Sequence, residues 1–285
     1  MLYPIYRCGY ALAKNLPLRV SYRIAEIVAL VYFHFSRKDR KILSDNLKGI
    51  LGVNAGKKEI DAHTLGILKN FAKYLVDFFR SAGLSKEDIL KPVTVKNRQY
   101  LDEALSLGKG VIVLTAHLGN WELGAAAVAA MGYPISAIVL NHSDQRINTL
   151  FSGNRAINDV KNIPIGVAVR GCYRVLRQNE VLAIAGDRDY TGGGMEIEFF
   201  GKKTLMPKGA AQLALRTGAS IVGGFLIRQP GDTFVLEFLE PISFEGTDDM
   251  DKDLDDLMKK CVSVLEDYVK KYVDQWYVFD RIWAE

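Results

Sequence analysis

The chain has 285 residues, of which 49% are hydrophobic and 25% charged, and its formal net charge is +4. This composition is that of a globular protein with a large core, and it argues against a disordered or fibrous chain. Three scattered cysteines without a C-x-x-C pair favour neither a disulfide framework nor a zinc site, so we expect structural thiols in a reducing compartment.

Positive charge is concentrated in the first part of the chain. Residues 1–48 hold nine Lys and Arg against three acidic residues, a net charge of +6, which leaves −2 for the remainder. Such an asymmetry favours an anionic surface as partner. No zinc-finger, helix-turn-helix or aromatic RNA-binding pattern accompanies the charge, so we expect no nucleic-acid partner. The first residues also lack the pattern of a signal peptide.

Residues 18–36 are predicted to form an amphipathic helix. Its apolar face carries Ile24, Ile27, Val28, Val31 and Phe35. Arg23 and Glu26 interrupt the apolar run, whereas a spanning helix needs about 20 mostly apolar residues. We therefore expect the helix to lie among lipid headgroups, with the basic residues that follow it reaching phosphates. Packing against the protein's own body is the alternative.

The rest of the chain alternates between helical and strand patterns. A second amphipathic helix is expected over 59–82 and ends at Gly83. Strands are predicted over 111–114, 135–140, 181–185, 220–227 and 233–239, and helices over 121–131, 143–160, 171–178, 207–217 and from the acidic stretch at 248 to 272. This alternation predicts a single α/β domain over 49–285, with a mixed, mostly parallel sheet and helices on both faces. The basic amphipathic helices of 1–48 are an appendage to it.

His117 is the first candidate catalytic residue, because it lies between the strand 111–114 and the helix 121–131. Ligands bind at that edge of open α/β sheets. A neutral His can take a proton from a hydroxyl, and a carboxylate on its other ring nitrogen fixes the tautomer. Glu122 lies five residues further on and is expected to be that carboxylate. No G-x-S-x-G elbow is present, so His117 is predicted to act directly on a substrate hydroxyl.

A second group of candidates follows the strand 181–185. If that strand neighbours 111–114, then Asp187, Arg188 and Asp189 face His117 across the sheet edge. An Arg there suits a phosphate or the oxyanion of a tetrahedral intermediate, and a surface ion pair is the alternative.

Three further residues complete the predicted site. Asn120 either donates to the oxyanion or caps the helix that follows it. Lys208 lies beside the start of the helix 207–217, where backbone amides favour a phosphate. Arg155 is a further candidate cation, with a solvated helix face as its alternative.

Several blocks resemble one known family. His117-Leu-Gly-Asn-Trp-Glu122 is similar to the H-x4-D/E block of the glycerolipid acyltransferase superfamily, in particular its lipid A late acyltransferases (lauroyl and myristoyl transferases) and mannoside acyltransferases. Further blocks match in order over roughly residues 40–280: Asn46-Leu47, Ala185-Gly186-Asp187-Arg188-Asp189, Phe199-Phe200-Gly201 and Lys208-Gly209-Ala210. The resemblance implies acyl transfer from a thioester of acyl carrier protein or coenzyme A to a hydroxyl of a membrane lipid, such as a lipid A precursor or another glycolipid, with no bound cofactor.

The resemblance also implies roles and a location. His117 would deprotonate the acceptor hydroxyl and Glu122 would orient it. Asp187, Arg188, Asp189 and the basic residues would hold the phosphates of the acceptor or donor. Residues 1–48 would bind the cytoplasmic face of the inner membrane, peripherally or monotopically, although lipid A members of the family usually carry a plainer anchor.

Two other functions remain open at this point. A metal-dependent hydrolase would use ligands of types that suit a divalent ion, namely His117, Glu122, His142, Asp187 and Asp189. The spacings H-x-x-x-H and H-x-H are absent, however, and we expect no metal. A non-catalytic lipid-binding module would bind anionic membranes through residues 1–48, but it has no need of a strand–His–helix block.

Overall fold

The computed structural model describes residues 2–140 and 143–283. A seven-stranded sheet forms its centre, in the order β1-β9-β8-β2-β5-β3-β4. The strands are β1 (Val93–Lys96), β2 (Val111–Thr115), β3 (Ile135–Val139), β4 (Val160–Pro164), β5 (Val181–Ala185), β8 (Ser220–Arg228) and β9 (Phe234–Phe238). All neighbouring pairs are parallel except β8 and β9, so the predicted mixed, mostly parallel sheet is confirmed.

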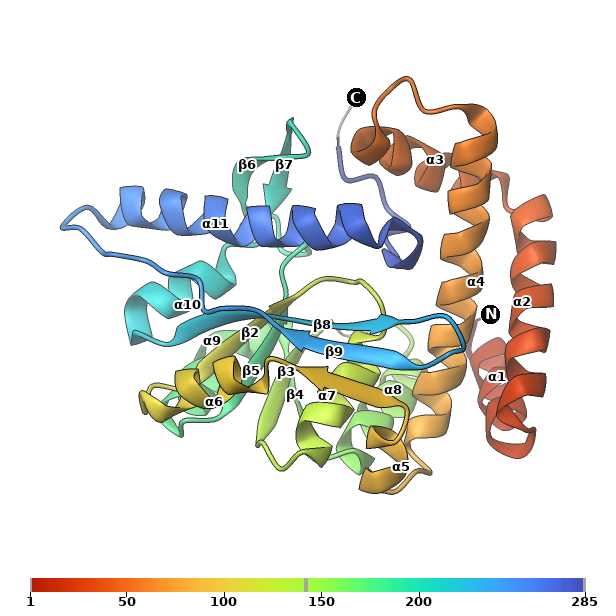
Figure 1. The fold of residues 1–285 in the computed structure, drawn as a ribbon, viewed down its shortest axis with the longest axis horizontal. Coiled ribbons are helices and arrows are strands. Elements are labelled where there is room, and N and C mark those ends of the chain that lie inside the picture. Colours follow the sequence, from red (N-terminus) through yellow and green to blue (C-terminus); the bar gives the residue numbers. More distant parts are fainter. Residues whose placement is uncertain (1, 141–142, 284–285) are drawn as a thin grey trace.

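Helices cover both faces of this sheet, as predicted. They are α5 (Lys86–Leu90), α6 (Arg98–Ser106), α7 (Trp121–Ala130), α8 (Gln145–Ile157), α9 (Ala168–Arg177), α10 (Gly209–Thr217) and α11 (Met250–Lys271). Successive side chains of a strand point to opposite faces. Val111 and Val113 of β2 accordingly pack with α6 and α7, whereas Ile112 and Leu114 pack with α9, α10 and α11. Figure 1 shows α11 on one side of the sheet and α6 and α7 on the other.

Four helices precede the sheet: α1 (Leu2–Asn15), α2 (Leu18–Phe35), α3 (Arg37–Leu51) and α4 (Lys57–Ser81). The helices expected over 18–36 and 59–82 are confirmed as α2 and α4, and α1 and α2 pack against α4 beside the sheet (Figure 1). The division at residue 48 falls inside α3 and stays a prediction.

The helix α2 has two different faces. Its buried residues are Ser21, Tyr22, Ala25 and Ala29. Its opposite face is exposed and apolar, with Phe35 82% exposed and Ile27 61% exposed. One face therefore packs on the protein, as the alternative interpretation held, and the other remains open. Among the residues that the structure describes, no helix is both long enough and apolar enough to cross a membrane.

The sequence pattern misses four strands. β1 and β4 are short strands at the two edges of the sheet; β4 begins at Val160, the last residue of the helix predicted over 143–160, and α8 ends at Ile157. A separate hairpin, β6 (Met195–Phe199) and β7 (Lys202–Met206), also escapes it. The turn of this hairpin is Phe200-Gly201, and both residues have positive φ angles. Last, 3-10 turns occur at η1 (Ile165–Val167) and η2 (Val273–Gln275).

Candidate active site

Two neighbouring strand ends bring His117 and Asp187 together. β2 and β5 are adjacent and parallel, and Thr115 of β2 is in register with Ala185 of β5. His117 and Asp187 each stand two residues beyond this matched pair, at the carboxyl edge of the sheet where ligand sites form. The imidazole Nδ1 lies 2.8 Å from Asp187 Oδ1, and the backbone N–H of His117 donates to Oδ2 at 3.0 Å.

Asp187 is a fully buried carboxylate beside the imidazole. Its exposure is 0%, and the indole N–H of Trp276 donates to its Oδ2 at 2.9 Å. Burial alone would raise the pKa of Asp187, but the charge of His117 and the hydrogen bonds from His117 and Trp276 outweigh it, so the pKa is lowered. An ionised Asp187 holds the proton of His117 on Nδ1. Nε2, without a hydrogen-bond partner among the described residues, is then free to accept a proton.

The predicted contact between Glu122 and His117 is wrong. Both carboxylate oxygens of Glu122 are bound by Arg155 of α8: Nε lies 2.8 Å from Oε2, and Nη2 lies 2.5 Å from Oε1. A guanidinium fork matches a carboxylate in two hydrogen bonds, which suits a pair this deeply buried. Asp187 supplies the carboxylate for the imidazole instead. The residue spacing could not reveal this, because the strand order decides which acid reaches His117.

The same ion pair corrects the prediction for Arg155. Its side chain is 15% exposed, and its remaining Nη1 donates to Asn162 at 3.3 Å. The guanidinium is therefore occupied by Glu122 and Asn162 and is not available for a substrate phosphate. Both interpretations of Arg155 from the sequence, as a phosphate-binding cation and as a residue on a solvated helix face, are therefore wrong.

Asn120 caps α7, the second of the two roles that the sequence left open. Its Oδ1 accepts from the backbone N–H of Leu123 at 3.1 Å, and its Nδ2 donates to Asp77 of α4 at 2.9 Å. The residue is only 1% exposed. Because both polar ends of the side chain are occupied, the proposed oxyanion role is wrong.

The Asp189 carboxylate forms hydrogen bonds within the loop in which it lies. Its carboxylate accepts from the backbone N–H of Thr191 and of Gly194, both at 3.0 Å, and from the Thr191 hydroxyl at 2.7 Å. These bonds fix the shape of the loop that borders the site. A carboxylate used in this way does not bind a phosphate, so that prediction is corrected.

Arg188 and Lys208 lie at the site. Arg188 forms an ion pair with Asp280, and its guanidinium carbon lies 4.6 Å from the centre of the Tyr190 ring. Lys208 directly precedes α10 and has no ion-pair partner among the described residues. Arg216, at the end of α10, lies on the same cavity. Sequence reasoning missed Arg216, because nothing local distinguishes it from a solvated helix residue. The phosphate-binding roles expected of Arg188 and Lys208 stay predictions.

A cavity of about 350 Å³ opens beside His117. Its walls are mostly apolar and come from β3 and the residue after it, β5 and the loop 188–194 that follows it, η1, α9 and α10; they include Ile138, Leu140, Ile165, Val169, Tyr173 and Ile184. Arg188, Lys208 and Arg216 add positive charge, and His117 lies among the lining residues. An apolar cavity with a few polar groups at defined positions is the usual form of a small-ligand site. This cavity suits an amphiphile that has an apolar chain and an anionic group.

The residues described do not form a cluster suited to a metal. Within 2–140 and 143–283, no group of three His, Cys, Asp or Glu could hold an ion. His142, one of the ligands that a metal-dependent hydrolase would use, lies outside the described residues. Glu122, another of them, is bound by Arg155.

Comparison with known proteins places this site in context. The family model described as bacterial lipid A biosynthesis acyltransferase matches residues 3–285. A phosphatidylinositol mannoside acyltransferase of Mycobacterium tuberculosis (strain CDC 1551 / Oshkosh) is 26% identical over 186 residues, which is 63% of this chain and 58% of that protein. The protein of the same name from Mycolicibacterium smegmatis is 25% identical over 158 residues, 54% of this chain and 52% of its own length. The chain thus spans little more than half the length of these curated relatives.

Proposed function

This chain belongs to the family of bacterial lipid A biosynthesis acyltransferases, and from that premise we propose that it transfers a fatty acyl group from a thioester to a hydroxyl of a membrane glycolipid. One observation supports this most strongly: His117, paired with a buried Asp187, lines an apolar cavity that also carries cations. A base, an acyl-sized apolar space and positive charge for a phosphate are what this reaction needs.

The proposed mechanism follows from the chemistry of the pair. His117 Nε2 takes the proton of the acceptor hydroxyl as its oxygen attacks the thioester carbonyl, and Asp187 balances the charge of the imidazolium. The tetrahedral intermediate then collapses, the carbon–sulfur bond breaks, and the imidazolium returns the proton to the departing thiolate. The products are an ester and a free thiol. The acyl group is not held on the enzyme at any stage.

The cations suggest the class of donor and acceptor. Acyl carrier protein and coenzyme A both present the acyl group on a phosphopantetheine arm, and a lipid A precursor or a phosphatidylinositol mannoside offers a sugar hydroxyl near a phosphate. We propose that Arg188, Lys208 and Arg216 bind one of these phosphates. No bound cofactor is needed. The curated relatives are named for phosphatidylinositol mannoside and the family for lipid A, so the proposed acceptor class is a phosphate-bearing glycolipid.

The exposed face of α2 supports a membrane location. Ile27, Val28, Val31 and Phe35 are all more than half exposed on this helix, and basic residues follow it at Arg37 and Lys38. An apolar helix face beside positive charge suits insertion among anionic headgroups. We propose peripheral binding at the cytoplasmic face of the inner membrane.

The test is a direct assay of acyl transfer. Purified protein is incubated with extracted bacterial membrane lipids and either radiolabelled acyl–acyl carrier protein or radiolabelled acyl-coenzyme A, and the labelled lipid is identified. We expect one donor to yield a labelled glycolipid. A folded protein that labels no lipid with either donor would overturn the proposal. Binding to anionic vesicles but not to neutral ones tests the membrane location separately.

A further inference from the structure

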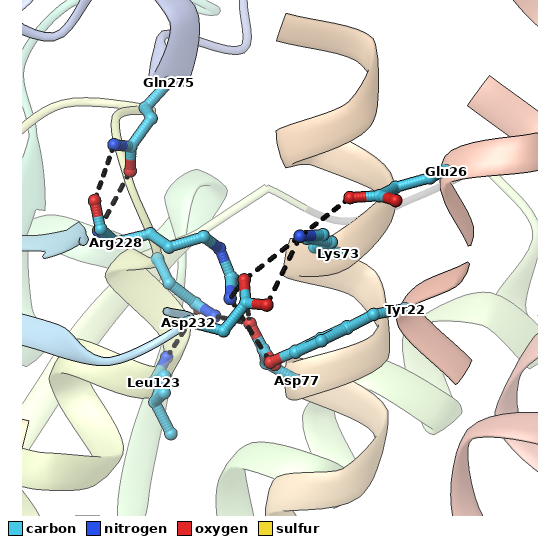
Figure 2. A network of polar contacts seen from close by, with 9 residues as sticks. Tyr22, Glu26, Lys73, Asp77, Leu123, Arg228, Asp232 and Gln275 are labelled. Atoms are coloured by element: carbon cyan, nitrogen blue, oxygen red, sulfur yellow. Dashed lines mark hydrogen bonds and ion pairs between the residues drawn. The ribbon is translucent and has the colours of Figure 1, made fainter. Parts of the chain in front are cut away.

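Figure 2 shows a polar network that includes Tyr22, Asp77 and Arg228. It contacts the loop that carries His117 through the side chain of Asn120. At its centre is Asp77 of α4, only 6% exposed. Asp77 Oδ2 accepts from Asn120 Nδ2 at 2.9 Å and from the Arg228 guanidinium, and Oδ1 accepts from the Tyr22 hydroxyl. A single carboxylate thus joins α2, α4, the end of β8 and the residue that caps α7.

Arg228 extends the network to the other side of the loop. Its Nη1 donates to the Tyr22 oxygen at 3.2 Å and to Asp232 at 3.1 Å. The side chain of Gln275 bonds to both backbone polar groups of Arg228, accepting from its N–H at 3.0 Å and donating to its C=O at 2.9 Å. The backbone C=O of Gln275 accepts from the N–H of Gly119 at 2.8 Å. The network therefore binds two consecutive residues of the loop: Gly119 through Gln275, and Asn120 through Asp77.

Backbone hydrogen bonds and one close contact also fix the main chain of this loop. Asn120 N–H donates to Leu226 C=O, and Tyr277 N–H donates to His117 C=O, both at 2.8 Å. Gly119 has a φ of +65°, and a Cβ there would lie 2.1 Å from the Leu226 oxygen. The orientation of His117 is consequently set by its supports.

We propose that Asp77 is a positioning residue for His117. Through Asn120 it holds the loop so that the imidazole meets both Asp187 and the cavity, and through Tyr22 it makes α2 part of that support. A buried ion pair adds little net stability, because the cost of removing its charges from water offsets their attraction. We propose that the ion pair of Asp77 and Arg228 serves to fix the position of His117. A displacement of about 1 Å at a reacting group can lower the rate by about 10²-fold. The kinetic part of the proposal rests on the proposed function.

The first test compares kcat with KM. Asp77→Asn is expected to lower kcat by about 10²-fold at most and to leave KM nearly unchanged, since the cavity is not altered. The double variant Asp77→Asn/Asn120→Asp restores a carboxylate–amide pair at these two positions, and Asp caps a helix as well as Asn does. We therefore expect it to recover most of the lost kcat. Tyr22→Phe keeps the ring and removes only the hydroxyl that donates to Asp77. We therefore expect it to lower kcat, but by less than Asp77→Asn does.

Asp253→Asn is the matched control. Asp253 is also a buried carboxylate, 5% exposed, and it accepts from Thr247 near the start of α11, outside this network. Its loss should lower the unfolding midpoint and leave kcat unchanged. If Asp77→Asn lowers kcat only in proportion to its unfolded fraction, as a general loss of stability would, the proposal is overturned.

The second test does not depend on acyl transfer. NMR of ¹⁵N-labelled histidine, with the His117 signals assigned by their loss in His117→Gln, reports which ring nitrogen carries the proton. We expect the Nδ1–H form in the wild-type protein and a changed signal in Asp77→Asn, or in Tyr22→Phe if Asp77→Asn does not fold. Unchanged His117 signals in a folded variant overturn the proposal. A changed signal in a protein that transfers no acyl group supports the positioning role and refutes the proposed function alone.

Discussion

The segment of residues 117–122, a loop followed by the start of α7, has two sides that carry similar ion pairs but differ in function. On the cavity side, His117 pairs with Asp187. On the support side, Arg228 pairs with Asp77 and Arg155 pairs with Glu122. Each pair joins a buried carboxylate to a basic side chain. An Arg keeps its charge at any physiological pH, whereas a His gains and loses a proton near neutrality. The basic partner therefore decides whether a buried carboxylate fixes structure or assists proton transfer.

Solvent access separates the two sides as well. The side chain of His117 is 20% exposed and lines the cavity. The side chains of Arg228 and Asp77 are 7% and 6% exposed. A substrate can reach only the cavity side, so substitutions on the two sides should affect different measurements.

The largest effect is expected for His117→Ala. Loss of the proposed general base should lower kcat by about 10²–10⁴-fold. The measurement is acyl transfer under saturating donor and acceptor. Asp187→Asn should act on the same step, so the double variant should be little worse than His117→Ala. If the His117→Ala protein transferred acyl groups at the wild-type rate, His117 would not be the general base, and the proposed functional difference between the two sides would be wrong.

Arg155→Met should chiefly affect stability. It leaves Glu122 as a buried carboxylate without its ion-pair partner, which costs about 3–5 kcal/mol of unfolding free energy. Urea denaturation at pH 7 measures this loss. The double variant Glu122→Gln/Arg155→Met should be more stable than the single one, because no buried charge remains. Equal stability of wild-type and Arg155→Met proteins would mean that this pair does not support the fold.

Gly119→Ala should lower both the free energy of unfolding and kcat. The positive φ costs about 1–3 kcal/mol for a residue with a side chain, and the added methyl meets the Leu226 carbonyl. Gly108→Ala is the matched control, since Gly108 has a similar φ of +71° with nothing within 4 Å of its Cβ position. We expect both variants to lose stability but only Gly119→Ala to lose kcat. An equal effect of the two on kcat would contradict the tight fit of the loop.

The smallest effect should appear in the pH dependence of stability. The native pKa of Asp187 is below its ordinary 3.8 because His117 and Trp276 outweigh the effect of burial. The unfolded chain therefore binds more protons at low pH, and this stabilisation, present above the unfolded pKa, is lost as the pH falls through the native value. Asp187→Asn should be less stable than the wild type at neutral pH and should lose less between about pH 5 and pH 2. Parallel curves from urea denaturation would contradict this.

Local patterns in the sequence predicted much of the framework. The apolar run at 111–114 predicted β2, and the three- and four-residue periodicity predicted α2 and α4, because these patterns depend only on which side chains share a face. The position of His117 between a strand and a helix followed in the same way. The edge strands β1 and β4 were missed because polar residues interrupt them: β1 reads Val-Thr-Val-Lys and β4 reads Val-Lys-Asn-Ile-Pro, so neither shows the continuous apolar run of β2.

The sequence placed Asp187 opposite His117 only on the condition that the strand 181–185 neighbours 111–114, and the tertiary structure decided that condition. Asp187 reaches His117 because β5 lies beside β2 in register, while Glu122 is held by an Arg from α8. Asp77 and Arg228 are 151 residues apart in the chain. Propensity and periodicity act over a few residues, whereas strand order and helix packing depend on burial across the whole chain. The sequence by itself therefore identified the imidazole, and only the fold selected the carboxylate that binds it.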